Sequence, residues 1–216
     1  MEMTIVDAVK ARHTVRRFRK EPLAAVDIVK MNLKIADINR NHNLQIRLLA
    51  DVNVPVNWVM KLFMTKGLRN YIILSGPSSP SVKEKLGYVG AEIMLYAQTI
   101  GLNTWWVGGS YDRRQVWRLA PGHVVAGIIV FGYGQNQGRP HRTRCPHEVS
   151  SYVGKMPTWF EEGVKLALLA PTPYNKQNFL ITGRDNEVEF YCDDGRWGDT
   201  VKGIIRYYFE IGSQHP

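Results

Sequence analysis

KEKLGYVGAEIMLYAQTIGLNTWWVGG, residues 83–109, combines the strongest helix signal in the chain with the start of an extended segment. One broad apolar face runs along the helical part and is formed by Leu86, Val89, Ile93, Met94, Ala97 and Ile100. Gly101 follows where a left-handed backbone commonly ends a helix, and residues 103–109 then read as a short extended piece. The stretch therefore predicts a helix that leads directly into an extended segment.

Outward from this stretch, helical and extended patterns alternate. Upstream, apolar spacing predicts helices over 4–12 and 25–38 and strands over 43–51 and 70–76. Downstream we expect a buried strand over 124–134, a long connection over 134–156, helices over 159–169 and about 198–211, and strands over 178–183 and 187–192. Thr158 and Glu161 have the spacing of a capping box at the start of a helix.

Two parts of the chain share one element order. Residues 25–101 and residues 157–212 both read helix, strand, strand, helix. Sequence identity between them is not obvious, so an internal duplication is inferred from element order only. The predicted fold class is α+β, with two related halves in a single chain.

The composition is that of an ordinary globular protein: 216 residues, 44% hydrophobic and 22% charged. No apolar run approaches the roughly 20 residues that span a bilayer, and the N-terminus lacks the apolar core of a signal peptide. Cys145 and Cys192 form no C-x-x-C pair, and His141, Cys145 and His147 lack a visible fourth ligand. We therefore expect a cytoplasmic protein without a metal site.

The net charge of +9 implies an acidic partner, such as nucleic acid, a membrane surface or a phosphate-bearing small molecule. The cations gather in two clusters, Lys10, Arg12, Arg16, Arg17, Arg19 and Lys20, and Arg139, His141, Arg142 and Arg144. Neither cluster alternates with aromatic residues, as a surface that binds single-stranded nucleic acid would. A solvated basic surface stays an alternative for either cluster alone.

Motifs for hydrolysis are missing from the sequence. There is no phosphate-binding G-x-x-x-x-G-K-[ST] loop and no G-x-S-x-G elbow. The glycines of GYGQNQG, residues 132–138, follow a buried strand with a polar run and do not open a helix, so we interpret them as a turn.

KARHTVRRF, residues 10–18, places two guanidinium groups, an imidazole and a hydroxyl within five residues, at Arg12, His13, Thr14 and Arg16. Arginine forks match phosphate oxygens bidentately, and the hydroxyl adds a donor. This pattern suits a terminal phosphate. The alternative is a helix C-terminus whose cations complement the helix dipole.

APTPYNKQNF, residues 170–179, is a rigid polar turn. Pro171 and Pro173 fix the backbone, so the side chains of Thr172, Asn175 and Gln177 lose little entropy when they bind. Amide side chains offer both donors and acceptors, as a ring with alternating carbonyl and N–H groups requires. The alternative is a loop whose Asn and Gln only cap the preceding helix.

Four motifs together resemble the nitroreductase family of flavin enzymes. RHTVRRF resembles the family's R-x-S-x-R-x-F entry motif, and APTPYNKQNF its A-P-S-x-x-N-x-Q-P-W turn. GYVGAEIMLYAQTIGLNTWWVGG resembles the central helix followed by G-L-G-T-x-W-x-G-G, and HRTR the basic K-x-R near the flavin phosphate. The turn follows the other three motifs here, an order similar to a smaller branch in which one chain contains two related halves and mimics the usual dimer.

This resemblance implies a mixed sheet with flanking helices, a first half over 1–145, a second half over 146–216, and FMN as cofactor. The implied phosphate site consists of Arg12, His13, Thr14 and Arg16, with Arg142 and Arg144 closing from the other side. The ring and ribityl portions are implied to contact Pro171, Thr172, Asn175 and Gln177, with Gly108 and Gly109 at the isoalloxazine edge near N5. Pro173, Asn178 and Phe179 depart from the family pattern, and Trp105 and Trp106 are bulky where the family often has Cys-Trp.

The expected function is an FMN-dependent oxidoreductase that passes hydride from NADPH or NADH to a small acceptor, such as a nitroaromatic or quinone, by a ping-pong mechanism. No catalytic base is expected. The alternatives are a flavin-binding redox sensor, a dehalogenase or flavin-destroying relative, and a basic nucleic-acid-binding module. The expected partners are small molecules, with no membrane or nucleic acid, and the chain is a monomer or homodimer.

Overall fold

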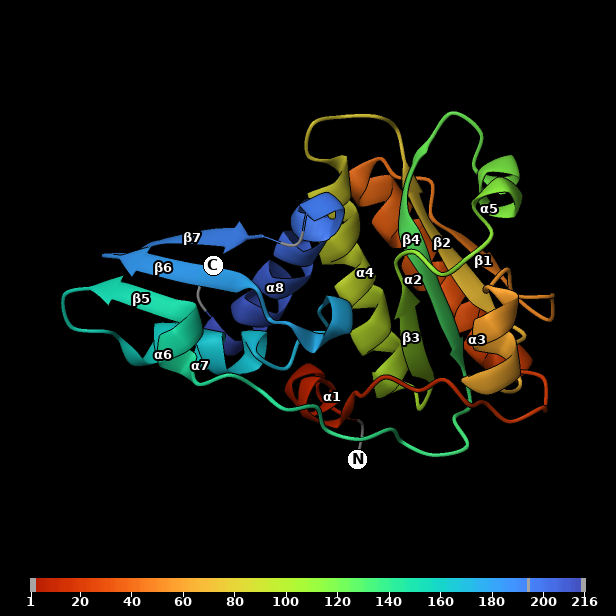
Figure 1. Ribbon diagram of the computed structural model, residues 1–216, viewed down its shortest axis with the longest axis horizontal. Coiled ribbons are helices and arrows are strands. Elements are labelled where there is room, and N and C mark those ends of the chain that lie inside the picture. The colour runs from red at the N-terminus through yellow and green to blue at the C-terminus, as the bar shows by residue number, and fades with distance from the viewer. Residues whose placement is uncertain (1–2, 194, 215–216) are drawn as a thin grey trace.

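The computed structural model describes residues 3–193 and 195–214, and these residues form two β-sheets on either side of two long helices (Figure 1). The elements up to the last strand of the first sheet are α1 (Ile5–Ala11), α2 (Ala25–His42), β1 (Arg47–Leu49), α3 (Trp58–Phe63), β2 (Tyr71–Gly76), α4 (Val82–Thr99), β3 (Asn103–Val107), α5 (Arg113–Leu119) and β4 (Val124–Gly132). The remaining elements are α6 (Pro146–Val149), β5 (Ser150–Val153), α7 (Thr158–Ala167), the 3-10 turn η1 (Pro173–Asn175), β6 (Phe179–Arg184), β7 (Glu187–Cys192), the 3-10 turn η2 (Gly195–Trp197) and α8 (Gly198–Ser213). The expected α+β class is confirmed.

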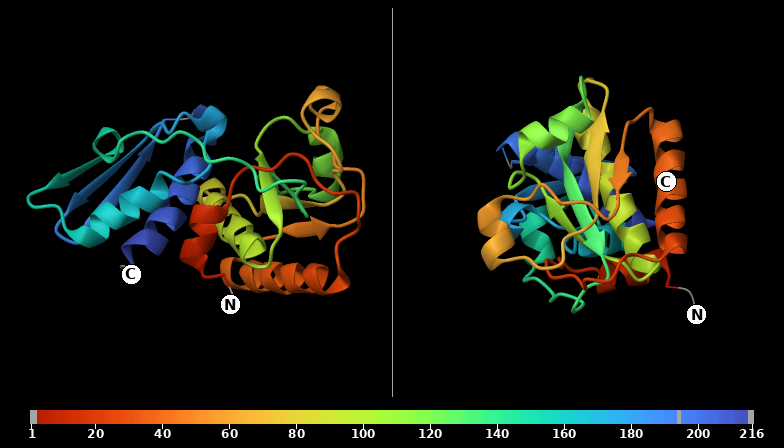
Figure 2. Two further views of the ribbon diagram at one scale, coloured as in Figure 1. Left: turned by 90° about the horizontal axis from the view of Figure 1, so that it is seen from below. Right: turned by 90° about the vertical axis from the view of Figure 1, so that its right-hand side faces the viewer.

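The first sheet has the order β1-β2-β4-β3, and each neighbouring pair is antiparallel. Side chains alternate across it, as the two-residue period of a strand requires. Ile72 and Leu74 of β2 pack on the face covered by α2 and α4, whereas Tyr71 and Ile73 pack with α5 and the entry segment on the other face. Because both faces are covered, as Figure 2 shows for α2, every residue of β2 is buried, and so is β4 after its first two residues.

The second sheet has the order β5-β6-β7, with β5 parallel and β7 antiparallel to β6. One face packs on α7 and α8 through Ile181, Phe160 and Phe209. Leu180 and Tyr191 point to the other face and are exposed. This sheet is therefore half-buried, which the alternating burial along β6 also shows.

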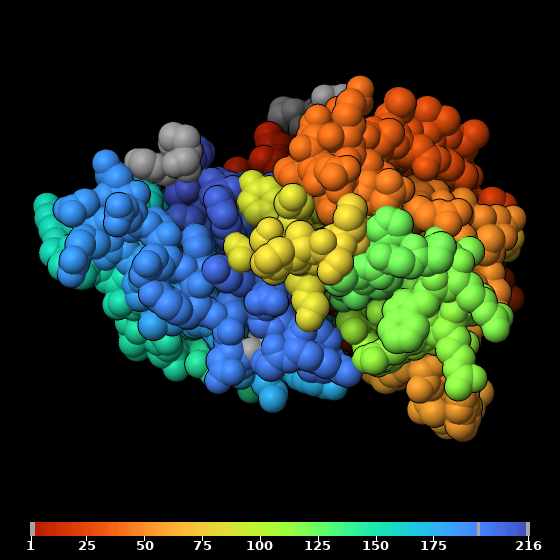
Figure 3. Space-filling model, turned by 90° about the horizontal axis from the view of Figure 1, so that it is seen from above, coloured from red at the N-terminus to blue at the C-terminus, as the bar shows by residue number. Residues whose placement is uncertain are grey.

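The helices α4 and α8 cross at the centre of the molecule, and two glycines allow the close approach. A Cβ atom on Gly87 would collide with the carbonyl oxygen of Thr200, and one on Gly203 would collide with that of Glu84. In Figure 3 the yellow segment at the start of α4 lies between the blue C-terminal segment and the green and orange surface of the N-terminal part of the chain. The crossing therefore fixes the two sheets relative to each other.

Several local expectations need correction. Residues 134–156 are more than a connection, because they contain α6 and β5. The capping box predicted at Thr158 is wrong, since Pro157 occupies the N-cap position and no side chain bonds the first turn. The short helices α3 and α5 were not predicted. The expected order helix, strand, strand, helix is present in α7, β6, β7 and α8, whereas α3 interrupts it between β1 and β2 in the first part. The duplication stays a prediction.

Candidate functional site

The entry segment 13–18 lies along β3. Thr14 bridges Thr104 in parallel pairing, and the amide of Val15 donates to the carbonyl of Thr104 over 3.1 Å. Val15 and Phe18 are buried in the core. Thr14 and Arg16 line a cavity, where the Arg16 guanidinium lies 5.5 Å from the ring centre of Trp105. Burial lowers the pKa of Arg16.

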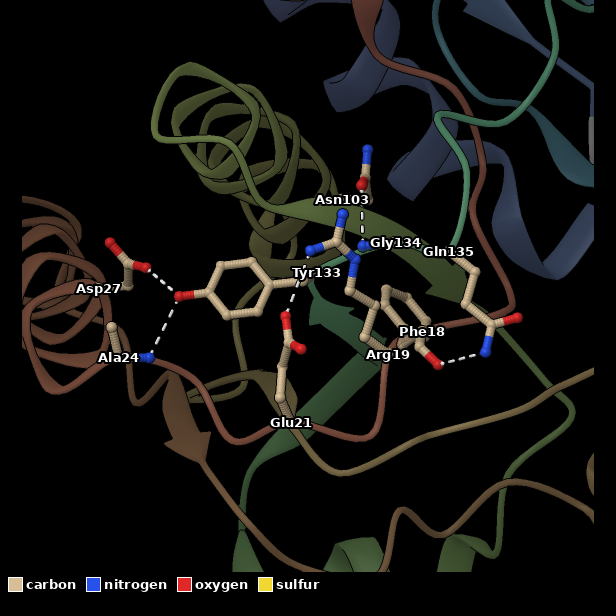
Figure 4. Close-up of polar contacts among 9 residues, drawn as sticks. All are labelled: Phe18, Arg19, Glu21, Ala24, Asp27, Asn103, Tyr133, Gly134 and Gln135. Carbon is tan, nitrogen blue, oxygen red and sulfur yellow. Dashed lines mark hydrogen bonds and ion pairs between the residues drawn. The ribbon is translucent and has the colours of Figure 1, made fainter.

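The turn after β4 holds this entry segment in place (Figure 4). The side-chain amide of Gln135 donates to the backbone carbonyl of Phe18 over 3.1 Å, and the backbone amide of Gly134 donates to Asn103 Oδ1 over 3.1 Å. Tyr133 donates its hydroxyl proton to Asp27 at 2.6 Å, which ties the same turn to α2. The glycine-rich GYGQNQG segment thus acts as a structural turn, as the sequence predicted.

Arg12 ends α1 and points into the protein. Its side chain is 3% exposed, and its Nε donates to the hydroxyl of Tyr208 on α8 over 2.9 Å. The next residue, His13, is half-buried. Burial, together with the nearby cations Arg12 and His141, lowers the pKa of His13. Arg12 therefore makes a positively charged corner, with His13 beside it, between α1, α8 and residues 138–141.

The turn after α7 has a strained backbone. Tyr174, Asn175 and Gln177 have φ angles of 53°, 56° and 52°, in the left-handed region that side chains other than glycine seldom adopt. Thr172 steadies the turn, because its carbonyl accepts from the amide of Asn175 and its Oγ1 accepts from the amide of Gln177. Such strain is held only where surrounding contacts over-determine it.

Those contacts come from the basic loop, residues 139–145. The side-chain amide of Asn175 donates from Nδ2 to the backbone carbonyl of Arg142 over 2.8 Å. The side-chain amide of Gln177 donates from Nε2 to the same oxygen over 3.1 Å. Gln177 Oε1 accepts from the amide of Arg144 over 2.8 Å. Gln177 is buried, whereas Arg142 and Arg144 are exposed. Asn175 and Gln177, the amide pair, thus hold the backbone of the loop and leave the guanidinium groups of Arg142 and Arg144 exposed.

A cavity of about 350 Å³ lies between the first sheet and α8. Sequence-predicted residues in its lining are Thr14, Arg16, Gly108, Gly109, Pro171 and Thr172. Trp105, Trp106, Tyr174 and Trp197 add aromatic walls. A volume of this size is typical of small-molecule sites, which are apolar with a few placed polar groups.

Gly108 and Gly109 form a flat edge of the cavity. A Cβ atom on Gly108 would lie 3.2 Å from Nε1 of Trp197, and one on Gly109 would lie 2.9 Å from a terminal nitrogen of Arg196. The Trp197 indole donates to the carbonyl of Gly108 over 3.3 Å, and Tyr174 packs edge-on against Trp197 at 6.3 Å. A side chain at either glycine would crowd Trp197 or Arg196, so glycine keeps this edge of the cavity flat.

The predicted site residues therefore fall into two groups. Six line the cavity, as given above. Arg12, His13, Arg142, Arg144, Asn175 and Gln177 lie outside its lining and form the basic end. Sequence reasoning missed Arg196 and Trp197 of η2 and Thr200, Val201 and Ile204 of α8. The GRWG sequence at 195–198, an aromatic and a cation between two glycines before a helix, was the available signal.

Within residues 3–193 and 195–214, no group of three or more His, Cys, Asp or Glu side chains is placed to hold a metal ion. The same residues include no helix with the length and apolar character of a membrane span.

Solved structures show the fold of this chain. A putative nitroreductase from Thermotoga maritima has a TM-score of 0.71 at 20% identity, covering 98% of this chain and 84% of that one. A putative nitroreductase from Desulfovibrio desulfuricans, in complex with FMN, has a TM-score of 0.55 at 12% identity, covering 69% of this chain and 96% of that one. Another from Exiguobacterium sibiricum, also with FMN, has a TM-score of 0.54 at 13% identity, covering 67% and 95%.

No curated protein matches the chain. The family model described as "Putative TM nitroreductase" matches residues 4–213, which include all four motifs and both ends of the site. Because that match extends over nearly the whole sequence, the chain belongs to this nitroreductase family.

Proposed function

We propose that this protein is an FMN-dependent oxidoreductase that takes hydride from NADPH or NADH and passes it to a small oxidised acceptor, such as a nitroaromatic or quinone. The observation that carries the proposal is the joining of three motifs at one cavity. The entry segment, the Gly108–Gly109 edge and the turn at Pro171 are far apart in sequence and line the same space. Family membership and the FMN complexes of two similar folds support it.

The residues present fit FMN. The cavity offers aromatic and glycine surfaces to a flat ring, and within the described residues its lining contains Arg16 and Arg196 but no carboxylate. A positive lining suits an anionic ligand. The basic end adds exposed Arg142 and Arg144 near the positively charged corner at Arg12 and His13.

Each group of residues has a distinct proposed role. Arg12, His13, Thr14, Arg16, Arg142 and Arg144 hold the phosphate, because guanidinium forks bind phosphate oxygens bidentately. Gly108, Gly109, Pro171 and Thr172 contact the ring and ribityl portions, and Asn175, whose side-chain amide also donates to the carbonyl of Arg142, contacts them from the basic end. The side-chain amide of Gln177 donates to the carbonyl of Arg142 and to Oδ1 of Asn175, so we assign Gln177 to positioning the basic loop.

When bound, FMN supplies the hydride chemistry. The protein's own residues bind, orient and exclude water, and no proton-transferring side chain is required. Trp105, Trp106 and Trp197 present apolar surface that keeps water from a flat ligand. One cavity serves the donor and the acceptor in turn, which gives ping-pong kinetics.

We also propose a cytoplasmic protein that works as a monomer or homodimer, with halves at 1–145 and 146–216 derived from one duplicated unit. The crossing of α4 and α8 joins these halves into one body. The cofactor then lies between the halves of one chain.

A visible absorption spectrum of the purified protein with added FMN, followed by anaerobic NADPH or NADH, tests the function. Retained flavin that bleaches is the expected result. Flavin that stays oxidised with both nucleotides would favour a redox-sensing protein. No retained flavin would refute the proposal and return attention to the basic clusters, where a steep salt dependence would reveal nucleic-acid binding.

A further inference from the structure

Arg196 lies at the edge of the cavity. We call this edge the rim and define it as Ser110, Tyr111, Arg113 and Arg196. Its guanidinium is 4.3 Å from the ring centre of Trp197 and lies against the backbone of Gly109. Arginine stacked on an indole keeps its in-plane N–H donors free, because the ring contacts only its face. The stack therefore presents a flat aromatic surface with donors at its edge.

Among the described residues, the side chains of Arg196 and Arg113 have no carboxylate partner. Other arginines in the protein do find one: Arg69 pairs with Asp51, and Arg206 pairs with Glu210 at 2.8 Å. Since the cavity lining also lacks a described acidic side chain, the rim carries positive charge without a described counter-ion.

Tyr111 brings the two rim cations into one neighbourhood. Its ring is half-buried, and its backbone bridges Val56. Burial raises the pKa of Tyr111, and the nearby charges of Arg113 and Arg196 oppose that rise. Both guanidiniums therefore lie within electrostatic reach of one phenol, which is itself a hydrogen-bond donor.

The rim is separate from the basic end. Arg12 is bonded to Tyr208, which lies ten residues (208 − 198) beyond the first residue of α8, and η2 immediately precedes that residue. At 1.5 Å per residue, the helix separates the two cationic regions by about 15 Å. One phosphate cannot contact both Arg12 and Arg196, so Arg196 is available to a different anionic group.

We propose that Arg196, with Arg113 and Tyr111, binds the anionic group of a flat second substrate that enters the cavity beside Trp197. This inference rests on the proposed function and names the substrate class of the same site. The anion is the carboxylate of an aromatic acceptor or a phosphate of the pyridine nucleotide. In either case the guanidinium binds the oxygens and Trp197 stacks on the planar part.

The test compares two probes of nearly equal shape, 4-nitrobenzoate and 4-nitrobenzamide, by calorimetric titration of oxidised protein without an electron donor. In the wild type the acid should bind roughly tenfold tighter than the amide. This ratio should fall towards one in Arg196→Gln and recover in part in Arg196→Lys. Arg114→Gln is the control, because Arg114 is an exposed arginine on α5, next to Arg113 and outside the cavity lining.

A second arm titrates NADP⁺ and NAD⁺ into the same proteins. A roughly tenfold loss of nucleotide affinity in Arg196→Gln, with an unchanged ratio of acid to amide affinity, assigns the anion to the nucleotide and supports the rim site. Equal binding of acid and amide to the wild type, together with unchanged nucleotide affinity in Arg196→Gln, overturns it.

Failure of the proposed function has a different readout. A protein that retains no FMN in its visible spectrum refutes the oxidoreductase, whereas the titrations can be made with or without flavin. In a flavin-free protein, an acid preference that Arg196→Gln removes still supports the rim site. Its absence overturns the rim site as well.

Discussion

At the basic end of the site, the side chains of Arg12, Asn175 and Gln177 all bond to protein partners, whereas at the rim the described residues offer Arg196 and Arg113 no anion. The basic end is built from a helix terminus and a strained turn whose backbone groups are bonded. The rim is built from Arg196 on a short 3-10 turn and from Ser110, Tyr111 and Arg113 after β3, and of these only Tyr111 is half-buried while the others are exposed.

This difference indicates two tasks. Bonded, buried groups cost little further ordering when a ligand binds, so the basic end suits one permanent ligand. Exposed side chains with free donors adapt to ligands of different shape, so the rim suits molecules that exchange. Substitutions can show whether ligand binding at the basic end and at the rim is independent. The largest effect is expected for a change at α8, because both ends contact this helix.

Gly87→Ala tests whether α8 holds the two ends in one body. A Cβ atom at this position collides with the carbonyl oxygen of Thr200, and backbone cannot move aside as a flexible side chain can. We expect destabilisation of about 3 kcal/mol and a melting temperature lower by roughly 6–12 °C, measured by thermal unfolding. FMN affinity and probe binding at the rim should fall together.

Ala91→Gly is the matched control for Gly87→Ala, because it changes a buried residue on the same helix without adding an atom. It should lower stability by about 1 kcal/mol through helix propensity and leave the relation of the two ends intact. An unchanged melting temperature in Gly87→Ala would show that α4 and α8 can separate without loss.

Arg12→Ala removes the buried arginine of the basic end. The hydroxyl of Tyr208 loses its donor, which costs about 1–3 kcal/mol of stability. FMN affinity should fall roughly tenfold to a hundredfold because a charged phosphate contact is also lost, as measured by fluorescence titration. The ratio of acid to amide binding at the rim should stay at its wild-type value.

Tyr208→Phe separates the two effects of Arg12→Ala. It breaks the same hydrogen bond but keeps the guanidinium. If both variants lose FMN affinity equally, Arg12 acts only by packing on α8, and its place in the phosphate site is wrong.

Gln177→Met tests the basic loop. The change keeps the volume but removes the bonds to Arg142 and Arg144, so the loop loses its fixed backbone while its guanidiniums remain. We expect about tenfold weaker FMN binding and faster hydrogen exchange of the Arg144 amide. Lys176→Met is the control, because Lys176 is exposed in the same turn.

Asn175→Ala distinguishes a ring contact from loop positioning. A ring contact predicts a larger effect on the rate of flavin reduction than on FMN affinity. Loop positioning through the carbonyl of Arg142 predicts the reverse, a loss of affinity like that of Gln177→Met. Rapid-mixing reduction and equilibrium titration, made on one variant, decide between them.

The sequence predicted more of the basic end than of the rim, for physical reasons. Arg12, Thr14 and Arg16 are close together in the sequence. The helical spacing of the apolar residues in α4 likewise predicts that helix from the local sequence. The contact between the amide pair and the basic loop needs a tertiary bond over some thirty residues, as between Arg144 and Gln177, which no local pattern encodes. The resemblance identified these residues and assigned Gln177 to the pyrimidine and ribityl portions of FMN, whereas its bonds to the basic loop are visible only in the structure.

The rim and the capping of α7 show the limits of local patterns. Arg196 and Trp197 reach the cavity only because α8 crosses α4, and that crossing depends on Gly87 and Gly203, two small residues with no chemical signature. Thr158 and Glu161 have capping-box spacing, but Pro157 takes the N-cap position, so the helix starts one residue earlier than the pattern requires.

The smallest expected effect is the pH dependence from His13. Burial, Arg12 and His141 lower its pKa, so the folded protein binds this proton less well than the unfolded chain, whose histidine pKa is about 6.5. Stability from this group is therefore intact above about pH 6.5 and declines as pH falls through 6.5 towards the folded pKa. Urea midpoints at pH 7.5, 6.5 and 5.5 should decline less in His13→Gln than in the wild type. As the control, His147→Gln removes an exposed histidine outside the site and should show the same decline of the urea midpoint as the wild type. Equal declines in all three proteins would mean that His13 does not contribute to the pH dependence of stability.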